Sequence, residues 1–201
     1  MLPLMLDIKT VPIAVIGSGY AAEMRLKLLS ESGAGEVDVF SPEKPEGLAK
    51  FSVRTVFDRW PADSDFQSGR YKIVYVADVD RQDAETYAQM AHGIGALVNV
   101  HDVKALCDFH VPARLVRGDL QITVSTNGKA AGLARVVRDH LARSVFGPDW
   151  AGRVSSMAKA RDKWREEGAS FQQLVDRTEV FISDRRWLSA VRPERKAGPE
   201  G

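Results

Sequence analysis

The stretch VPIAVIGSGYAAEMRLKLL, residues 11–29, constrains the fold more than any other part of the chain. An apolar run at residues 13–16 breaks at a glycine-rich turn and continues into a segment with helical spacing. Gly17, Gly19 and Ala22 match G-x-G-x-x-G/A, the pattern that opens a dinucleotide-binding strand–turn–helix unit. In that pattern the glycines allow a tight turn and a close approach to a pyrophosphate, and the small third residue lets the helix pack on the strand. The stretch predicts a nucleotide-binding unit, and a strand–turn–helix that binds nothing is the alternative.

Composition narrows the classes of function. The 201 residues carry a formal net charge of +1, which argues against bulk nucleic-acid binding. Cys107 is the one cysteine, so an intrachain disulfide is impossible, and we expect it to be a small buried hydrophobe. Residues 1–6 have no basic segment, so we expect neither a signal peptide nor a membrane span, and a cytoplasmic location. The four histidines lack H-x-x-H spacing, which argues against a permanent zinc site.

Strand and helix patterns alternate from the glycine turn to about residue 100. The strands are expected at residues 13–16, 37–40, 53–57, 73–77 and 96–100. The helices are expected after residue 19, at 48–51 and at 83–93, and residues 59–69 are expected to be irregular. This alternation predicts an α/β fold, a Rossmann-like doubly wound and mostly parallel sheet, with its ligand crevice at the carboxyl ends of the strands.

The pattern changes near residues 107–116. Two strand-like runs, 109–116 and 120–126, flank Arg117-Gly118-Asp119, a turn typical of a β-hairpin. Helical spacing follows at residues 130–146, 150–166 and 170–188. We therefore expect a Rossmann domain, a hairpin-and-helix region, a small helical carboxyl-terminal part and a disordered tail, at residues 1–107, 108–147, 148–192 and 193–201.

Acidic residues follow three of the predicted strands, at the edge where ligands bind. Glu43 could hold the adenosine ribose or be a solvated loop charge, and Lys44 beside it leaves the choice between NAD and NADP open. Asp78 follows the fourth strand on the crevice side. Asp102 follows the fifth, where a partly buried carboxylate could act as a general base or simply cap a turn. Because adjacent strand residues face opposite sides, we expect His101 to lie outside the pocket of Asp102.

Several short motifs occur together in the middle of the chain. They are N-V-x-D at residues 99–102, F-x-x-P at 109–112, R-G-D-L at 117–120 and S-T-N-G at 125–128. With Leu2-Pro3-Leu4, the glycine turn and Ala77-Asp78, they make about residues 1–165 resemble the precorrin-2 dehydrogenase family. Members of this family act in sirohaem synthesis, alone or as the amino-terminal part of sirohaem synthase. The combination of motifs is specific, whereas each motif alone carries little weight.

The resemblance implies a reaction in which a hydride passes from precorrin-2 to NAD and sirohydrochlorin is formed. Asp102 matches the principal catalytic residue of the family and would act as general base. The implied cofactor-binding residues are Gly17, Gly19, Tyr20, Ala21, Ala22, Pro42, Glu43, Asp78, Asn99 and Val100. Some members also insert ferrous iron into the product, so iron as a second substrate stays open.

The implied substrate is an octacarboxylate macrocycle, so its pocket should offer cations and N–H groups. The candidates are His110, Ser125, Thr126, Asn127, Gly128, Lys129 and Arg135. The alternatives are a structural role for His110 and a solvated helix face for Lys129 and Arg135. Ala130-Ala131 replace the Ser-Pro that is usual in the family, which puts chelation in doubt.

The resemblance also implies a homodimer that forms through residues 108–147. The apolar residues at helical spacing, Leu133, Val137, Leu141 and Val145, would need such a surface to cover them. We expect no membrane or nucleic-acid partner and, without the methyltransferase module of the fused synthases, no synthesis of precorrin-2. One alternative is a bifunctional dehydrogenase and ferrochelatase. The alternative from another class is a non-catalytic NAD(H)- or tetrapyrrole-binding regulator.

Overall fold

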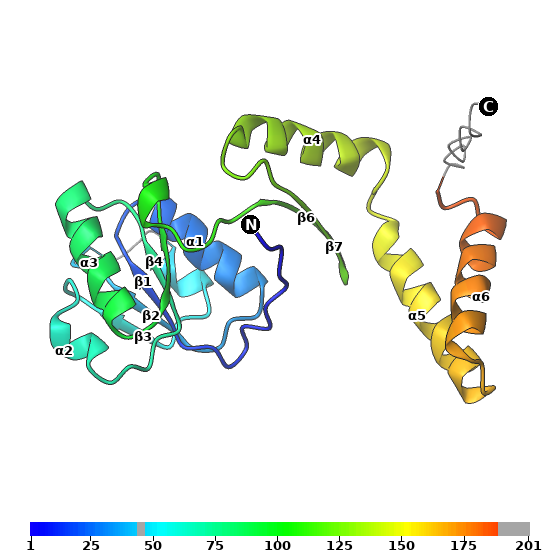
Figure 1. Cartoon of the computed structure of the whole chain (residues 1–201), viewed down its shortest axis with the longest axis horizontal. Coiled ribbons are helices and arrows are strands. Elements are labelled where there is room, and N and C mark those ends of the chain that lie inside the picture. Colours follow the sequence, from blue (N-terminus) through cyan, green and yellow to red (C-terminus); the bar gives the residue numbers. More distant parts are fainter. Residues whose placement is uncertain (44–46, 189–201) are drawn as a thin grey trace, which may run out of the picture. The chain divides into compact units, whose positions relative to one another are not determined.

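The structure is a computed structural model that describes residues 1–43 and 47–188 (Figure 1). The chain divides into two compact units, with the boundary between Val111 and Pro112. Our finer division at residues 107, 147 and 192 stays a prediction, and the expected tail at 193–201 lies outside the described residues.

The first unit is built on a five-stranded sheet of order β3-β2-β1-β4-β5. Its strands are β1 (Ile13–Ile16), β2 (Val37–Phe40), β3 (Thr55–Phe57), β4 (Ile73–Val76) and β5 (Leu97–Val100). Every neighbouring pair is parallel. The chain runs outward from β1 in both directions, so the switch point of the sheet lies between β1 and β4, where such folds bind ligands. The Rossmann-like fold class is confirmed.

Helices cover both faces of this sheet, which explains why β1, β2 and β4 are buried at every residue. Ile13 and Val15 pack with α1 (Tyr20–Glu31). Ala14 and Ile16 pack in a second cluster with α3 (Arg81–Gly93). The alternation follows from the two-residue period of a strand, and Figure 1 shows the two helices on opposite sides of the sheet.

Shorter elements complete the first unit. They are the 3-10 turns η1 (Leu48–Lys50) and η2 (Lys104–Leu106) and the helix α2 (Asp63–Phe66). The expectation of an irregular segment at residues 59–69 was wrong at α2. The carboxylate of Asp65 accepts the N–H of Ala62, and the Phe66 side chain is buried. Four residues are too few to show a helical period in the sequence.

A fully buried carboxylate ties β2 to its surroundings. The Asp38 side chain is 0% exposed and accepts hydrogen bonds from Arg54 Nε and Nη2 at 3.0 and 2.7 Å. Arg70 Nη2 and the Tyr71 hydroxyl donate to the same carboxylate at 2.8 and 2.7 Å. Burial and the hydrogen bond to Asp38 raise the pKa of Tyr71. The buried charge is therefore met by donors from beyond β2.

The second unit combines a β-hairpin with three helices. The antiparallel strands β6 (Ala113–Arg117) and β7 (Leu120–Val124) pair Arg117 with Leu120, which leaves a two-residue turn. The helices are α4 (Ala131–Ser144), α5 (Trp150–Glu166) and α6 (Phe171–Asp184). The α4 helix packs on the hairpin, and α5 pairs with α6, as Figure 1 shows. The predicted hairpin and helices are confirmed, with ends shifted by a few residues.

The α4 helix leaves apolar side chains uncovered. Ala134 is its one fully buried residue, whereas Leu133 and Val136 are 56% and 57% exposed. The other side of α4 contacts the hairpin. There Arg138 Nη1 donates to the Arg114 carbonyl at 3.2 Å. Among the residues described here, no helix combines the length and the apolar character that crossing a membrane requires.

Candidate cofactor site and active site

The turn between β1 and α1 admits glycine alone at its first position. Gly17 has φ of 146°, and a Cβ there would lie 1.9 Å from the Ala77 carbonyl oxygen. The same Cβ would come within 3.3 Å of the methyl of Ala22, which is fully buried under the turn. The backbone of β4 therefore packs directly on the glycine turn, as the G-x-G-x-x-A pattern predicts.

The first N–H groups of α1 meet a carboxylate from the next strand. Gly19 is the N-cap and supplies no side-chain cap. Asp78, just after β4, fills that role: its Oδ2 accepts the N–H groups of Ala21 and Ala22 at 2.6 and 3.1 Å. Asp78 has φ of 54°, a left-handed conformation that aspartate tolerates better than most residues. This contact joins the loop after β4 to the start of α1.

A cavity of about 400 Å³ lies at the carboxyl ends of β4 and β5. It is lined by Val76, Ala77, Asp78, Val79, Arg81, Ala84, Val100, His101, Asp102 and Val103. Asp78, which touches the start of α1, and Asp102, at the tip of β5, therefore face the same cavity. The predicted crevice at this edge of the sheet is present.

Asp102 and His101 are neighbours in the turn after β5, and both line this cavity. The strand β5 ends at Val100, and Asp102 adopts a left-handed φ of 59°. His101 Nε2 lies 3.7 Å from Asp102 Oδ1. Our expectation that His101 lies outside this pocket was wrong, because the alternation of a strand no longer applies in the turn. The side chain of Asp102 is 90% exposed, so the protein by itself does not supply the partial burial that a general base here would use.

Arg81 is a cavity residue that the sequence analysis missed. It begins α3 and lines the cavity with Asp78 and His101. Its Nε donates to Glu85 Oε1 at 2.9 Å. A cation in the first turn of a helix opposes the helix dipole, and this signal in the sequence could have identified it.

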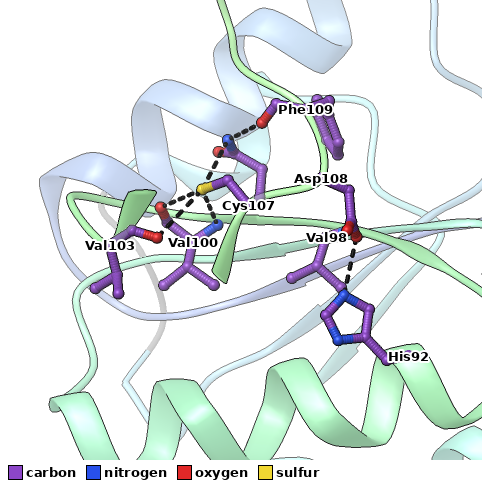
Figure 2. A network of polar contacts seen from close by, with 8 residues as sticks. His92, Val98, Val100, Val103, Cys107, Asp108 and Phe109 are labelled. Carbon is purple, nitrogen blue, oxygen red and sulfur yellow. Dashed lines mark hydrogen bonds and ion pairs between the residues drawn. The ribbon is translucent and has the colours of Figure 1, made fainter. Parts of the chain in front are cut away.

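Hydrogen bonds fix the tip of β5 to the loop that follows it (Figure 2). The Cys107 sulfur accepts the Val100 N–H at 3.3 Å and lies 3.1 and 3.4 Å from the carbonyls of Val100 and Val103. Asp108 Oδ2 accepts the Val98 N–H at 2.8 Å and pairs with His92 Nε2 at 2.9 Å. Cys107 is half-buried and packs against the core cluster beside α3, so the expectation of a small buried hydrophobe is met in part, and its sulfur also makes polar contacts.

Asn99 on β5 holds an unused acceptor. The residue is 4% exposed, and its Nδ2 donates to the Phe109 carbonyl at 2.9 Å. Its Oδ1 is buried and has no hydrogen-bond partner among the described residues. A buried acceptor of this kind costs free energy unless a donor reaches it.

The remaining predicted cofactor residues lie at the start of α1 and after β2, and none of them lines the cavity. At the start of α1, Ala21 and Ala22 are buried, whereas Tyr20 is 75% exposed. Pro42 and Glu43 are exposed after β2, where the Ser41 hydroxyl donates to the Glu43 carbonyl. Lys44, which left the choice of cofactor open, lies outside the described residues.

The predicted substrate residues are divided between the two units. His110 is half-buried in the first unit and does not line the cavity. The others are found before and in α4 of the second unit, and they are Ser125, Thr126, Asn127, Gly128, Lys129 and Arg135. Asn127 and Gly128 have left-handed φ of 52° and 73°. Lys129 and Arg135 are exposed cations.

Comparison with known protein families places the chain in one of them. Residues 4–113, more than half of the chain, match the family described as putative NAD(P)-binding. The chain belongs to this NAD(P)-binding family. Residues 117–144 also match the family described as sirohaem biosynthesis protein central. The family supports a nicotinamide cofactor for the glycine turn.

Curated relatives of this NAD(P)-binding chain include siroheme synthases. The siroheme synthase of Saccharophagus degradans is 32% identical over 160 residues, which cover 78% of this chain and 34% of the relative. Siroheme synthase 1 of Aeromonas salmonicida is 30% identical over 198 residues, 95% of this chain and 39% of the relative. The chain thus spans little more than a third of the length of these relatives.

A solved structure shares the fold of this NAD(P)-binding chain. The structure of SirC, a precorrin-2 dehydrogenase, superposes with a TM-score of 0.73 at 22% identity. The match covers 95% of this chain and 94% of SirC. Sheet, hairpin and carboxyl-terminal helices therefore form a known combination.

The residues of the NAD(P)-binding turn fit the cofactor that the family implies. Gly17 forms a tight cradle that a Cβ would fill. The start of α1 presents backbone N–H groups that already hold an anion, the Asp78 carboxylate. The buried Asn99 Oδ1 remains free to accept a hydrogen bond from a group such as a carboxamide. These three features match the phosphate and amide groups of a nicotinamide dinucleotide.

Proposed function

We propose that the chain is an NAD-dependent precorrin-2 dehydrogenase, which oxidises precorrin-2 to sirohydrochlorin. One observation carries the proposal: Asp78, bonded to the start of α1, and Asp102, at the tip of β5, line a single cavity. A cofactor held at the glycine turn would therefore extend into the cavity that the Asp102 carboxylate lines. The siroheme synthases among the relatives and the SirC fold agree with this reaction.

In the proposed mechanism the glycine turn at Gly17 and Gly19 would hold a nicotinamide dinucleotide, which would supply the hydride acceptor. Asp102 accepts the proton that leaves precorrin-2, so one hydride and one proton together account for the oxidation. A macrocycle over the cavity would exclude water from the exposed Asp102. Arg81 supplies a cation for the carboxylates of the substrate, and His101 lines the same cavity.

We propose NAD as the preferred cofactor on the basis of the loop after β2. Glu43 follows β2 in the position where an acidic residue binds the ribose hydroxyls of NAD. A carboxylate there would repel the additional phosphate of NADP. Asn99 and Val100 are proposed to contact the nicotinamide, with the free Asn99 Oδ1 as acceptor.

The turn before α4 and the residues beside it are proposed to hold the substrate. Lys129 and Arg135 are exposed cations that suit carboxylates, and the turn at Asn127 and Gly128 exposes polar backbone. His110 is the further candidate. The hydroxyls in this turn also act locally, since Thr126 Oγ1 accepts the Ala130 N–H at 3.0 Å.

A homodimer through residues 108–147 belongs to the same proposal. The side chains of Leu133 and Val136 are more than half exposed on α4. A second copy would cover this apolar surface and gain the free energy of its burial. In this arrangement α4 and the hairpin form the dimerisation region.

Anaerobic incubation with precorrin-2 and NAD tests the proposed reaction. We expect NADH and sirohydrochlorin to appear together in the absorbance spectrum. Asp102→Ala should lower turnover by about 100-fold or more, the usual worth of a general base, and leave NAD affinity nearly unchanged. Asp63→Ala, which removes an exposed carboxylate on α2, is the matched control and should keep full turnover.

This assay, together with a cofactor-binding measurement and an iron-insertion assay, separates the alternatives. Normal turnover in Asp102→Ala would remove this residue from the catalytic role. NADH binding without any turnover of precorrin-2 would favour a regulator. Sirohaem formed from sirohydrochlorin and ferrous iron, above the rate without enzyme, would show a bifunctional enzyme with iron as a second substrate.

A further inference from the structure

The carboxylate of Asp78 sits where a phosphate of the cofactor would bind. Its Oδ2 accepts the N–H groups of Ala21 and Ala22 at 2.6 and 3.1 Å. It also packs on Gly19, because a Cβ on that glycine would lie 2.6 Å from Oδ2 and 2.9 Å from the Asp78 Cβ. The space that Gly19 leaves open for a close ligand is thus filled by a side chain of the protein.

These are the donors that a dinucleotide uses in a turn of this kind. The start of a helix offers unpaired N–H groups and a partial positive charge, and the G-x-G-x-x-A pattern directs them to the pyrophosphate. The two N–H groups already bonded to Asp78 cannot make the same bonds to a phosphate. Two anions at this distance would also repel each other.

We infer that Asp78 competes with the cofactor for the start of α1 and must leave it before the pyrophosphate can bind. The inference rests on cofactor binding at the glycine turn and makes Asp78 a determinant of cofactor affinity. This differs from a role as a cofactor ligand, which would make Asp78 contribute to affinity. Asp78 is then a residue whose removal strengthens binding.

The cavity offers a second position for the Asp78 carboxylate. Asp78 lines the 400 Å³ cavity together with Arg81 and His101, the two side chains there that carry or can carry positive charge. A rotation of the side chain toward them would leave the N–H groups of α1 and keep the carboxylate near cations. The exchange costs the two bonds to α1, and this cost lowers the measured affinity for the cofactor.

Two substitutions at Asp78 separate competition from other roles. Its φ of 54° is left-handed, so Asp78→Gly and Asp78→Asn both suit the backbone, whereas alanine would be strained. Asp78→Gly removes the competitor, and Asp78→Asn keeps its shape without the charge. Glu23→Gln is the matched control, because it removes a negative charge from the first turn of α1 without touching these bonds.

The experiment measures the dissociation constants of NAD and NADH for the full chain by calorimetry. We expect Asp78→Gly to bind at least about tenfold more tightly than the wild type, which corresponds to about 1.4 kcal/mol. Asp78→Asn should fall between the two, and Glu23→Gln should stay within about twofold of the wild type. Without cofactor, Asp78→Gly should melt at a lower temperature, because α1 loses its cap.

Other outcomes overturn the inference in distinct ways. Equal affinity in all variants would show that the carboxylate leaves without cost. Weaker binding in Asp78→Gly and Asp78→Asn would show that Asp78 is a ligand of the cofactor. If Glu23→Gln bound the cofactor as much more tightly as Asp78→Gly does, the gain in affinity would come from the loss of any negative charge near α1 and not from the removal of a competitor. If neither the wild type nor any variant bound NAD or NADH, the cofactor site itself would fail, and the inference with it.

Discussion

Removal of the Asp38 carboxylate should destabilise the sheet far more than removal of a surface charge. Four hydrogen bonds from three side chains converge on it at 2.7 to 3.0 Å, and it is fully buried. Asp38→Ala leaves the guanidinium groups of Arg54 and Arg70 without their shared anion. It also leaves the Tyr71 hydroxyl without its acceptor.

The size of the effect follows from the exposure of the partners. Removal of one member of a buried ion pair costs about 3–5 kcal/mol when the other stays buried. Here the side chains of Arg54 and Arg70 are 39% and 35% exposed, so water can solvate them in part. The Tyr71 hydroxyl adds about 1 kcal/mol as an unpaired donor. We therefore expect Asp38→Ala to lower the free energy of unfolding by about 3 kcal/mol, the low end of that range.

Native-state hydrogen exchange is the suitable assay, because it reports on the sheet independently of the second unit. The slowest amides of β1 and β2 should lose about 3 kcal/mol of protection in Asp38→Ala. Glu85→Ala breaks an exposed pair with Arg81 and should cost less than about 0.5 kcal/mol. A loss below about 1 kcal/mol in Asp38→Ala would refute the view that this carboxylate organises the buried polar cluster.

Three further predictions concern the turn, the pH response and assembly. Gly17→Ala should weaken NADH binding about tenfold or more in a fluorescence titration, because its Cβ would meet the Ala77 carbonyl at 1.9 Å; wild-type affinity would contradict the cradle. Because the pKa of the Tyr71 hydroxyl is raised in the folded state, the unfolded chain loses this proton at a lower pH than the folded chain. The free energy of unfolding should therefore fall above about pH 10, and less steeply in Tyr71→Phe. Equal slopes of this free energy against pH in the two proteins, measured by urea unfolding, would exclude the linkage. Leu133→Lys combined with Val136→Lys should shift the mass measured by light scattering toward the monomer, and an unchanged mass would place the interface elsewhere.

Local patterns in the sequence were sufficient to predict most secondary structure. Strand and helix periods record which faces are buried, and a parallel sheet follows from their alternation. The five strands and the hairpin appeared at the predicted places. The four-residue helix α2 did not, because a segment shorter than two turns leaves no period to detect.

The residue pattern was sufficient to predict the glycine turn and the edge of the sheet that carries the site. Gly17, Gly19 and Ala22 specify a local geometry, and parallel strands bring their carboxyl ends to one edge wherever they lie in the chain. Which side chains meet at that edge depends on contacts between segments that are far apart in the chain. Asp78 reaches the start of α1 across 57 residues of sequence, and a left-handed turn at Asp102 brings His101 into the cavity. Periodicity reports the burial of neighbours along the chain, whereas contacts of this kind depend on where folding brings distant segments and on backbone angles that no pattern of hydrophobicity encodes.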